Sequence, residues 1–284
     1  MNLLKIKNVF IFDLDGTIYL GEHLIPGAKQ VVEYLQQKGA LLYFLTNNGS
    51  KSRKGFVDKL QKMNIIVSEE QILSSGYVTS LKLGRKPNIH NIFVIGSNEL
   101  ISMIENEGLT TLNSQYSDSQ LYAPILDGSI HADAIVTSID IHFSYAKIRT
   151  AMELIHRGAE FYATNGDTTF PEKSQLWPGG GVMLKAVEAC VGKEPNEIFG
   201  KPNIASLEMI LDQVKEKGFS RKDMILIGDR LETDILQANR MGIESVLVET
   251  GVNKFTDIES LPDRDQRKEL TPTYMISSIK DLLN

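Results

Sequence analysis

Short apolar runs that are typical of buried strands recur along the chain, separated by segments with helical periodicity. Val9–Phe12 is followed by Pro26–Gly27, by a segment with apolar residues every three or four positions, and by a second run at Leu41–Leu45. A strand, a helix and a second strand in this order form a βαβ unit with parallel strands. Similar runs follow at Met224–Ile227 and Ser245–Val248. The pattern predicts an α/β protein built on a parallel sheet.

The composition of the chain changes twice in its middle. Lys82–Pro87 and Trp177–Gly181 contain the Gly and Pro residues that are typical of linkers. Between them the α/β alternation repeats, with strands expected at Ile92–Ile95, Ala134–Ile139 and Phe161–Thr164. The sequence therefore predicts a second α/β unit inserted into the first.

We expect the two units to divide the chain at these linkers. Residues 1–85 and 180–284 would form the main α/β unit, and residues 86–179 the inserted α/β unit. Near the C-terminus, the charged segment Asp257–Arg267 predicts a surface loop, and Ile276–Leu283 predicts a short helix.

Polar side chains stand where several of the expected strands end. Because parallel strands have their carboxyl ends at one edge of the sheet, we expect these side chains to converge there, where ligands bind in open α/β sheets. Asp13 and Asp15 fall on the same side of the first strand, about 6.6 Å apart along the chain. Two such carboxylates are accommodated by a divalent cation, or by a raised pKa on one of them. A turn that closes the strand is the structural alternative.

Together these groups supply the parts of a phosphoryl-transfer site. Asp13 is ionised at neutral pH and can attack phosphorus to form an aspartyl-phosphate. Asp15 can protonate the leaving oxygen and later deprotonate the hydrolytic water. Thr46 and Lys201 can donate hydrogen bonds to the phosphoryl oxygens, over which charge spreads in the transition state.

The remaining carboxylates define a candidate Mg²⁺ site. Asp229 can complete this site with Asp13, and Asp234, at the start of a helix, is better placed to hold a metal-bound water. The motifs offer neither His nor Cys for a Zn²⁺ site. We therefore expect activity to need a small hard cation.

Composition excludes several classes of function. The 284 residues carry a net charge of -6, so there is no basic excess to attract nucleic acid or an anionic membrane. No apolar run approaches the ~20 residues that a membrane span needs. The single cysteine, Cys190, excludes an intramolecular disulfide and is expected to be buried on a helix face. With no signal-peptide layout at the N-terminus, these features predict a cytoplasmic protein.

Four motifs, in this order, resemble those of the haloacid dehalogenase (HAD) superfamily over nearly the whole chain. They are Asp-Leu-Asp-Gly-Thr (13–17), Leu-Thr-Asn-Asn (45–48), Gly-Lys-Pro (200–202) and Gly-Asp-Arg-Leu-Glu-Thr-Asp-Ile (228–235). The inserted unit resembles the class IIA branch, which includes p-nitrophenyl, phosphoglycolate and pyridoxal phosphatases and NagD-type nucleotidases. The resemblance implies a Rossmann-like parallel sheet core with helices on both faces, and a C2-type α/β cap that selects the substrate.

The resemblance also implies roles for individual residues. The nucleophile falls on Asp13, the acid/base on Asp15, and the phosphate-binding residues on Thr46, Asn47 and Lys201. The metal ligands fall on Asp13, Asp15 and Asp229, with Asp234 outside them, and in the family it is the carbonyl of the Asp15 position that binds Mg²⁺. Two positions depart from the pattern without touching the chemistry: Gly49 stands where many members have Ser or Ala, and Ser138 where many have Gly.

In the expected cap, the segment Asp140–Tyr145 resembles an Asp-x-His-Phe-Ser segment of pyridoxal and phosphoglycolate phosphatases. This implies that His142 contacts the ligand. A surface histidine before a helix is the structural alternative.

The resulting hypothesis is a Mg²⁺-dependent phosphatase that acts on a small phosphorylated metabolite, such as a sugar phosphate, phosphoglycolate, pyridoxal phosphate, a nucleotide or an aryl phosphate. A dehalogenase needs no second acid, so Asp15 and the metal carboxylates argue against it. A phosphotransferase or mutase stays open from the sequence. A non-catalytic binding or regulatory protein is expected to have lost Asp13, Asp15 or Lys201. Cap-mediated homodimers are common among similar enzymes, and the sequence leaves the oligomeric state open.

Overall fold

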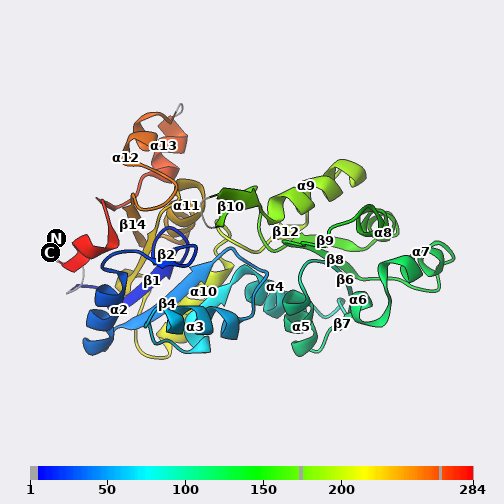
Figure 1. Cartoon of the computed structure of the whole chain (residues 1–284), viewed down its shortest axis with the longest axis horizontal. Helices are drawn as coiled ribbons and strands as arrows, with labels where there is room; N and C mark the ends of the chain where they lie inside the picture. The colour runs from blue at the N-terminus through cyan, green and yellow to red at the C-terminus, as the bar shows by residue number, and fades with distance from the viewer. Residues whose placement is uncertain (1–5, 173–174, 262–263, 284) are drawn as a thin grey trace.

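The computed structural model describes residues 6–172, 175–261 and 264–283. Within this part of the chain, two parallel sheets lie one beyond the other along the long axis of the molecule, with helices packed around each (Figure 1). This confirms the predicted class: a Rossmann-like α/β core with a second α/β unit inserted into it.

The first sheet has six parallel strands, in the order β15-β14-β13-β1-β4-β5. Helices from both halves of the chain pack around it, α2 (Ala28–Gln37), α3 (Arg53–Lys62), α4 (Ser75–Gly84), α10 (Ala205–Lys215) and α11 (Leu236–Met241). Its strands are β1 (Val9–Asp13), β4 (Leu41–Thr46), β5 (Ile72–Ser74), β13 (Met224–Gly228), β14 (Glu244–Val248) and β15 (Tyr274–Ile276).

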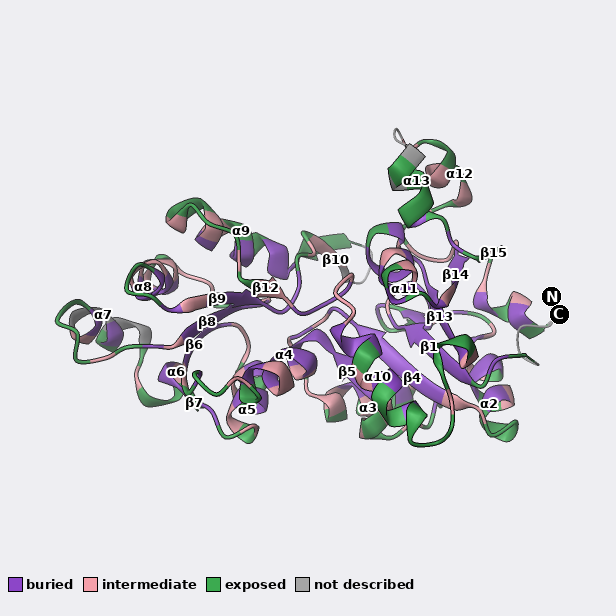
Figure 2. Cartoon of the chain, turned by 180° about the vertical axis from the view of Figure 1, so that it is seen from behind, coloured by how far each residue is buried: buried purple, intermediate pink, exposed green. Residues whose placement is uncertain are grey.

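The strand β1 lies at the centre of this sheet, between β4 and β13. All five of its residues are buried, and Phe12 stacks on Phe44 of β4 with ring centroids 5.8 Å apart. A strand covered on both faces needs apolar residues at successive positions, which explains the unbroken run before Asp13. Figure 2 shows β1 and β4 coloured as buried.

The second sheet has five parallel strands in the order β12-β9-β8-β6-β7. They are β6 (Asn91–Ile95), β7 (Thr110–Thr111), β8 (Ala134–Thr137), β9 (Glu160–Ala163) and β12 (Glu197–Ile198). Its helices are α5 (Asn98–Asn106), α6 (Leu112–Gln115), α7 (Asp118–Leu126), α8 (Tyr145–His156) and α9 (Gly180–Val191). Two short hairpins accompany the sheets, β2–β3 (Tyr19–Leu20, His23–Leu24) and β10–β11 (Thr169–Glu172, Gln175–Pro178).

The second unit extends beyond the expected boundary at residue 179. The α9 residues Met183, Leu184 and Val187 are buried in the hydrophobic cluster of the second sheet, and β12 pairs with β9. The expected linkers are also largely structured, since Lys82–Gly84 ends α4 and Trp177–Pro178 ends β11. These segments are ordered by tertiary packing and strand pairing, which their local composition does not reveal.

Three further expectations were wrong. The expected loop at residues 257–267 contains parts of α12 (Phe255–Glu259) and α13 (Arg264–Leu270), because Leu270 is buried in a cluster with Leu231. Ile276 belongs to β15, which pairs with β14, and only Ile279–Leu283 is helical. Cys190 is exposed near the end of α9.

Among the described residues, no helix combines the length and the apolar character that crossing a bilayer requires.

The burial of β1 predicts how two isoleucines differ in their contribution to stability. Ile11 is fully buried, whereas Ile66 is 65% exposed. Replacing Ile11 by Ala should lower the free energy of unfolding by roughly 2–5 kcal/mol, because it leaves a cavity in a packed core. The matched variant Ile66→Ala should change it by less than about 0.5 kcal/mol. Urea unfolding of both variants checks this, and equal losses would contradict the assigned position of β1.

Candidate active site

A cavity that opens to solvent lies where the carboxyl ends of the strands of both sheets meet. Its lining includes every core residue that the sequence analysis singled out, and also residues from the second unit. The polar side chains that follow the parallel strands therefore converge at one site, as expected. The predicted residues in the lining are Asp13, Asp15, Thr46, Asn47, Lys201, Asp229 and Asp234.

A sharp turn after β1 brings the main chain against Asp229. Gly16 has a φ of +92°, a conformation that side chains disfavour, and a Cβ built on it would lie 2.5 Å from Asp229 Oδ2. The Thr250 hydroxyl donates to the Gly16 carbonyl at 2.6 Å and holds the turn from the other side. The glycine of the motif therefore allows the loop that carries Asp15 to approach the carboxylate that follows β13.

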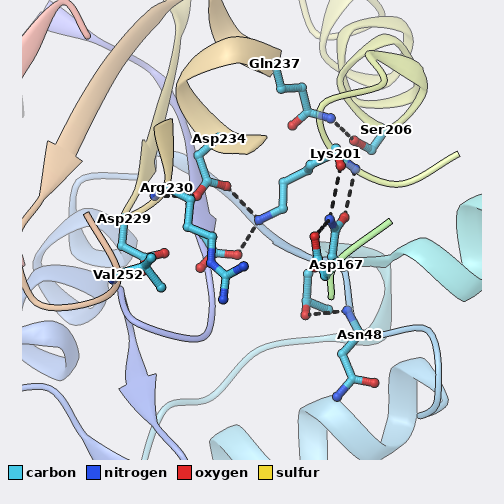
Figure 3. Close-up of polar contacts among 12 residues, drawn as sticks. Asn48, Asp167, Lys201, Ser206, Asp229, Arg230, Asp234, Gln237 and Val252 are labelled. Atoms are coloured by element: carbon cyan, nitrogen blue, oxygen red, sulfur yellow. Dashed lines mark hydrogen bonds and ion pairs between the residues drawn. The ribbon is translucent and has the colours of Figure 1, made fainter. Parts of the chain in front are cut away.

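Lys201 lies between two carboxylates. Its ammonium donates to Asp13 Oδ1 and, at 2.6 Å, to Asp234 Oδ1, and Figure 3 shows the contact with Asp234. All three side chains are buried. Burial alone favours the neutral amine, but the charges of Asp13 and Asp234 outweigh it and raise the pKa of Lys201 above its ordinary value. Lys201 is therefore a fixed positive charge beside the predicted nucleophile.

The side chain of Asn47 holds the Lys201 backbone in place. Its Oδ1 accepts from the Lys201 N–H at 2.7 Å, and its Nδ2 donates to the Lys201 carbonyl at 3.1 Å. The same amide donates to Asp167 at 3.2 Å. Because both polar atoms of the Asn47 side chain are occupied by these hydrogen bonds, the geometry supports a role for Asn47 in positioning Lys201. Its predicted contact with phosphate stays a prediction.

Three carboxylates form a group that could hold a metal ion. Oxygen atoms of Asp13, Asp229 and Asp234 all lie within 4.8 Å of one another, and all three residues are buried. Asp229 Oδ2 accepts from the Val252 N–H at 2.6 Å, but its Oδ1 is buried without a hydrogen-bond partner in the described part of the chain. Buried oxygen atoms that lack partners suit a hard cation such as Mg²⁺.

Two of these carboxyls have raised pKa values, so their ionised forms are unfavourable without a nearby positive charge. Burial, reinforced by the negative charge of Asp234, raises the pKa of Asp229 to about 7. Burial also raises the pKa of Asp13, although Lys201 opposes the shift. A cation at the group would remove the cost of ionising these carboxyls, so the residues fit a resident metal.

The side chain of Asp15 does not belong to the three-carboxylate group. Burial raises its pKa, against the opposing charges of Lys59 and Lys201. A carboxyl that holds a proton more readily than usual suits a general acid. The structure thus separates the two aspartates that the sequence places two positions apart: Asp13 contacts Lys201, whereas the Asp15 carboxyl stands outside the metal-ligand group.

Sequence reasoning missed Asp167 and Arg230, which also line the cavity. Burial raises the pKa of Asp167, with Arg230 opposing the shift. Asp167 follows the carboxyl end of β9, as Asp229 follows that of β13. Asp167 follows an expected strand of the second unit, so it would have been predicted if polar residues after those strands had been considered as well as those after the core strands.

His142 does not line this cavity. It is exposed and lies at a separate hollow, whose lining includes Asp140 and Lys147. Asp140 accepts from the His142 N–H at 2.8 Å and from the buried Lys147 ammonium at 2.7 Å, which holds the loop to α8. The residue of this loop that does reach the cavity is Ile139. The predicted ligand contact of His142 stays a prediction.

Comparison with known proteins identifies the class. A sequence model of haloacid dehalogenase-like hydrolases matches residues 10–110, and a second HAD-hydrolase-like model matches residues 198–282. The chain belongs to the HAD family, as a member of its class IIA branch, and most of its second α/β unit lies between the two matched segments.

Individual relatives align with nearly the whole chain. The acid sugar phosphatase of Staphylococcus epidermidis is 29% identical over 98% of this chain and 96% of its own. The crystal structure of 4-nitrophenylphosphatase from Thermotoga maritima superposes with a TM-score of 0.83 at 28% identity, covering 99% of this chain and 98% of that one. The glycerol phosphate phosphatase of Mycobacterium tuberculosis, solved with magnesium, gives a TM-score of 0.83 at 26% identity, covering 99% and 78%.

The carboxylate group predicts a pH-dependent effect of Mg²⁺ on stability. Because the folded-state pKa of Asp229 lies near 7, above its unfolded value, the metal-free protein should lose stability as pH rises from about 4 to about 7. Saturating Mg²⁺ should raise the melting temperature by about 5 °C at pH 7.5 and by less at pH 5.5, where protons compete for the same oxygens. Thermal unfolding with and without Mg²⁺ tests this. Equal increments at both pH values, or an undiminished increment in Asp229→Asn, would contradict it.

Proposed function

We propose that this HAD-family protein hydrolyses a small phosphate monoester in two steps, through an aspartyl-phosphate on Asp13. The observation that carries the proposal is the meeting of Asp13, Lys201, Asp229 and Asp234, from separate segments of the chain, in one cavity. The activity class is that of a phosphoric monoester hydrolase. It is supported by relatives that are named phosphatases and match nearly the whole chain.

In the first step, a carboxylate oxygen of Asp13 attacks phosphorus and the bond to the leaving oxygen breaks. Lys201 donates to Asp13 Oδ1, which leaves Oδ2 as the attacking oxygen and fixes the carboxylate plane. Asp15 delivers its proton to the leaving oxygen, so the alcohol departs neutral. The raised pKa of Asp15 suits this donation.

In the second step, Asp15, now a carboxylate, removes a proton from the attacking water, and the bond from phosphorus to Asp13 breaks. Thr46, buried at the end of β4, and Lys201 donate to the phosphoryl oxygens. Asn47 keeps Lys201 in position through both of its backbone bonds.

Mg²⁺ is the cofactor, as the family and the carboxylate group indicate, and Asp13, Asp229 and the Asp15 carbonyl would bind it, with Asp234 alongside. When bound, it supplies positive charge that offsets the charge on the phosphoryl oxygens. The three buried carboxylates and the partnerless oxygen of Asp229 support this assignment.

For the substrate, we propose a small phosphorylated metabolite, with sugar phosphates first. The support is the acid sugar phosphatase of Staphylococcus epidermidis, which matches the chain almost from end to end. Residues of the second unit that line the cavity, such as Ile139 and Phe170, would contact the leaving group. A homodimeric state and a cytoplasmic location stay predictions from the sequence.

Replacing Asp13 by Asn should lower phosphate release by at least about 10⁴-fold, because the amide fits the same space but cannot act as the nucleophile. Steady-state release of phosphate from p-nitrophenyl phosphate with Mg²⁺ measures this. The exposed carboxylate Asp212 offers the control, and Asp212→Asn should keep wild-type activity. Turnover by Asp13→Asn close to the wild-type rate would overturn the mechanism.

Asp15→Asn should separate the two steps. A good leaving group needs no proton, so p-nitrophenol should still be released once, while water lacks its base and the aspartyl-phosphate should accumulate. Rapid-quench kinetics should show a burst of one p-nitrophenol per active site, followed by turnover reduced by roughly 10²–10⁴-fold. Unchanged steady turnover without a burst would remove Asp15 from the acid/base role.

A further inference from the structure

The loop that follows β9 reaches from the second unit to the residue that positions the catalytic lysine. Asn165 in this loop is 1% exposed, and its Nδ2 donates to the Asn47 carbonyl at 2.8 Å. Asp167 Oδ1 accepts from Asn47 Nδ2 at 3.2 Å. In the view of Figure 3, Asp167 lies below Lys201, to whose backbone Asn47 is bonded. Two residues of the second unit therefore hold the main chain and the side chain of Asn47.

These contacts use all the donors of the Asn47 side-chain amide. Its Nδ2 has two hydrogens, one for the Lys201 carbonyl and one for Asp167, and its Oδ1 accepts from the Lys201 N–H. Asn47 is only 8% exposed, so a hydrogen that lost its acceptor would stay unpaired, at a cost in free energy. The position of the Asn47 side chain, and with it that of the Lys201 backbone, therefore depends on Asp167.

Three successive glycines, residues 179–181, hold the loop against the first turn of α9. A Cβ built on Gly179 would lie 2.2 Å from the Asp167 carbonyl oxygen, and one built on Gly181 would lie 2.3 Å from the Gly166 carbonyl oxygen. The Gly181 N–H, a donor that the first turn of a helix leaves free, donates to the Asp167 carbonyl at 2.9 Å. The glycines of the expected linker thus allow direct backbone contact between α9 and the loop.

Asp167 is also held within the loop and from the core. Its N–H donates to Asn165 Oδ1 at 3.1 Å, which closes an Asx turn. The positive charge of Arg230, which follows β13, stabilises the ionised Asp167 carboxyl in the cavity that both residues line. Asp167 therefore presents Asn47 with an acceptor whose position is fixed.

We propose that Asp167 and Asn165 are positioning residues of the phosphoryl-transfer site, which hold Asn47 and, through it, Lys201 beside Asp13. This inference rests on the proposed phosphatase function and deepens it, because it makes a loop of the second unit necessary for the transfer step with every substrate. A displacement of about 1 Å in a reacting group can slow a reaction by about 10²-fold. Since Asp167 lines the cavity, direct contact of its carboxyl with the substrate is the competing explanation.

The first test separates kcat from KM in variants of Asp167. Asp167→Ala should lower kcat about 10–100-fold, by the same factor for p-nitrophenyl phosphate and glycerol 3-phosphate, and change KM less than about threefold. Asp167→Asn keeps an oxygen that accepts from Asn47, so its kcat should stay within about threefold of the wild type. Wild-type kcat in Asp167→Ala, or a loss that differs between the two substrates, would overturn the proposal.

Asp133 offers the matched control. This carboxylate of the second unit directly precedes β8, at the end of that strand away from the cavity, and its Oδ2 accepts from the N–H groups of His90 and Asn91, each at 2.8 Å. Asp133→Ala should lower the melting temperature and leave kcat unchanged. An equal loss of kcat in Asp133→Ala would show that any weakening of the second unit slows the reaction, and would overturn the specific role of Asp167.

A double-mutant cycle distinguishes positioning from direct contact. If Asp167 acts only through Asn47, Asp167→Ala should lower kcat less than about twofold further in a protein that already carries Asn47→Ala. Losses that multiply would show that Asp167 contacts the substrate by itself, and would overturn the proposal.

The glycines at the start of α9 provide an independent test of the loop. Gly181→Ala should lower kcat about tenfold, because its Cβ would displace the Gly166 carbonyl and move Asp167 with it. Gly166→Ala, in the loop itself, is the control, since a Cβ there would meet only Ile198, at 3.8 Å. Equal kcat in the two variants would contradict the support that α9 gives to the loop.

Thermal unfolding tests the same contacts without activity. Asn47→Ala and Asp167→Ala break the same hydrogen bond, so the fall in melting temperature of the double variant should be about 2–4 °C smaller than the sum of the two single falls. Additive falls would overturn the inference. Wild-type protein that releases no phosphate from either monoester would count against the proposed function, and coupled falls in that protein would still support the contact between Asp167 and Asn47.

Discussion

The arrangement of the site depends on one buried contact, the ammonium of Lys201 between the carboxylates of Asp13 and Asp234. Three charged groups are removed from water there, which is costly unless each is paired and hydrogen-bonded. Lys201 satisfies one oxygen of each carboxylate. The second oxygen of Asp234 accepts from the Arg230 N–H at 3.1 Å, and the second oxygen of Asp13 is left to attack the substrate. Because Lys201 contacts both Asp13 and Asp234, it also holds the end of β1 close to the segment after β13. These two segments carry the carboxylates of the proposed reaction.

Lys201 itself is held from the second unit as well as from the core. Asn47 binds both backbone groups of Lys201, and its own carbonyl accepts from Asn165 at 2.8 Å, in the loop after β9. Asp167 in the same loop accepts from the Asn47 amide. The loop after β9 therefore contacts the residue that positions the catalytic lysine, so the second unit is part of the site even before a substrate is considered.

Two positions at which the sequence departs from the pattern of the family lie close together at the junction of the two units. Gly49 and Ser138 lie far apart in the chain, but a Cβ built on Gly49 would be 3.0 Å from the Ser138 hydroxyl and 3.1 Å from that of Thr164. The Thr164 hydroxyl donates to the Ser138 hydroxyl at 2.9 Å, which holds both side chains in place beside Gly49. A side chain at Gly49 would crowd three hydroxyls, those of Ser138, Ser75 and Thr164, so the two units pack closely at this glycine.

The sequence by itself determined the parallel core and the identity of the residues at its carboxyl edge. Apolar runs such as Val9–Phe12 specify buried strands, and βαβ connections have one hand, so Asp13, Thr46 and Asp229 had to meet. Only the tertiary structure decided which atoms pair, that Asn47 serves Lys201, and that Asp167 joins the site. It also decided that residues 180–198 pack on the second sheet and that Trp177 stands opposite Phe170 in a hairpin. These features depend on contacts between segments that are distant in the chain, and no local pattern of polar and apolar positions encodes such contacts.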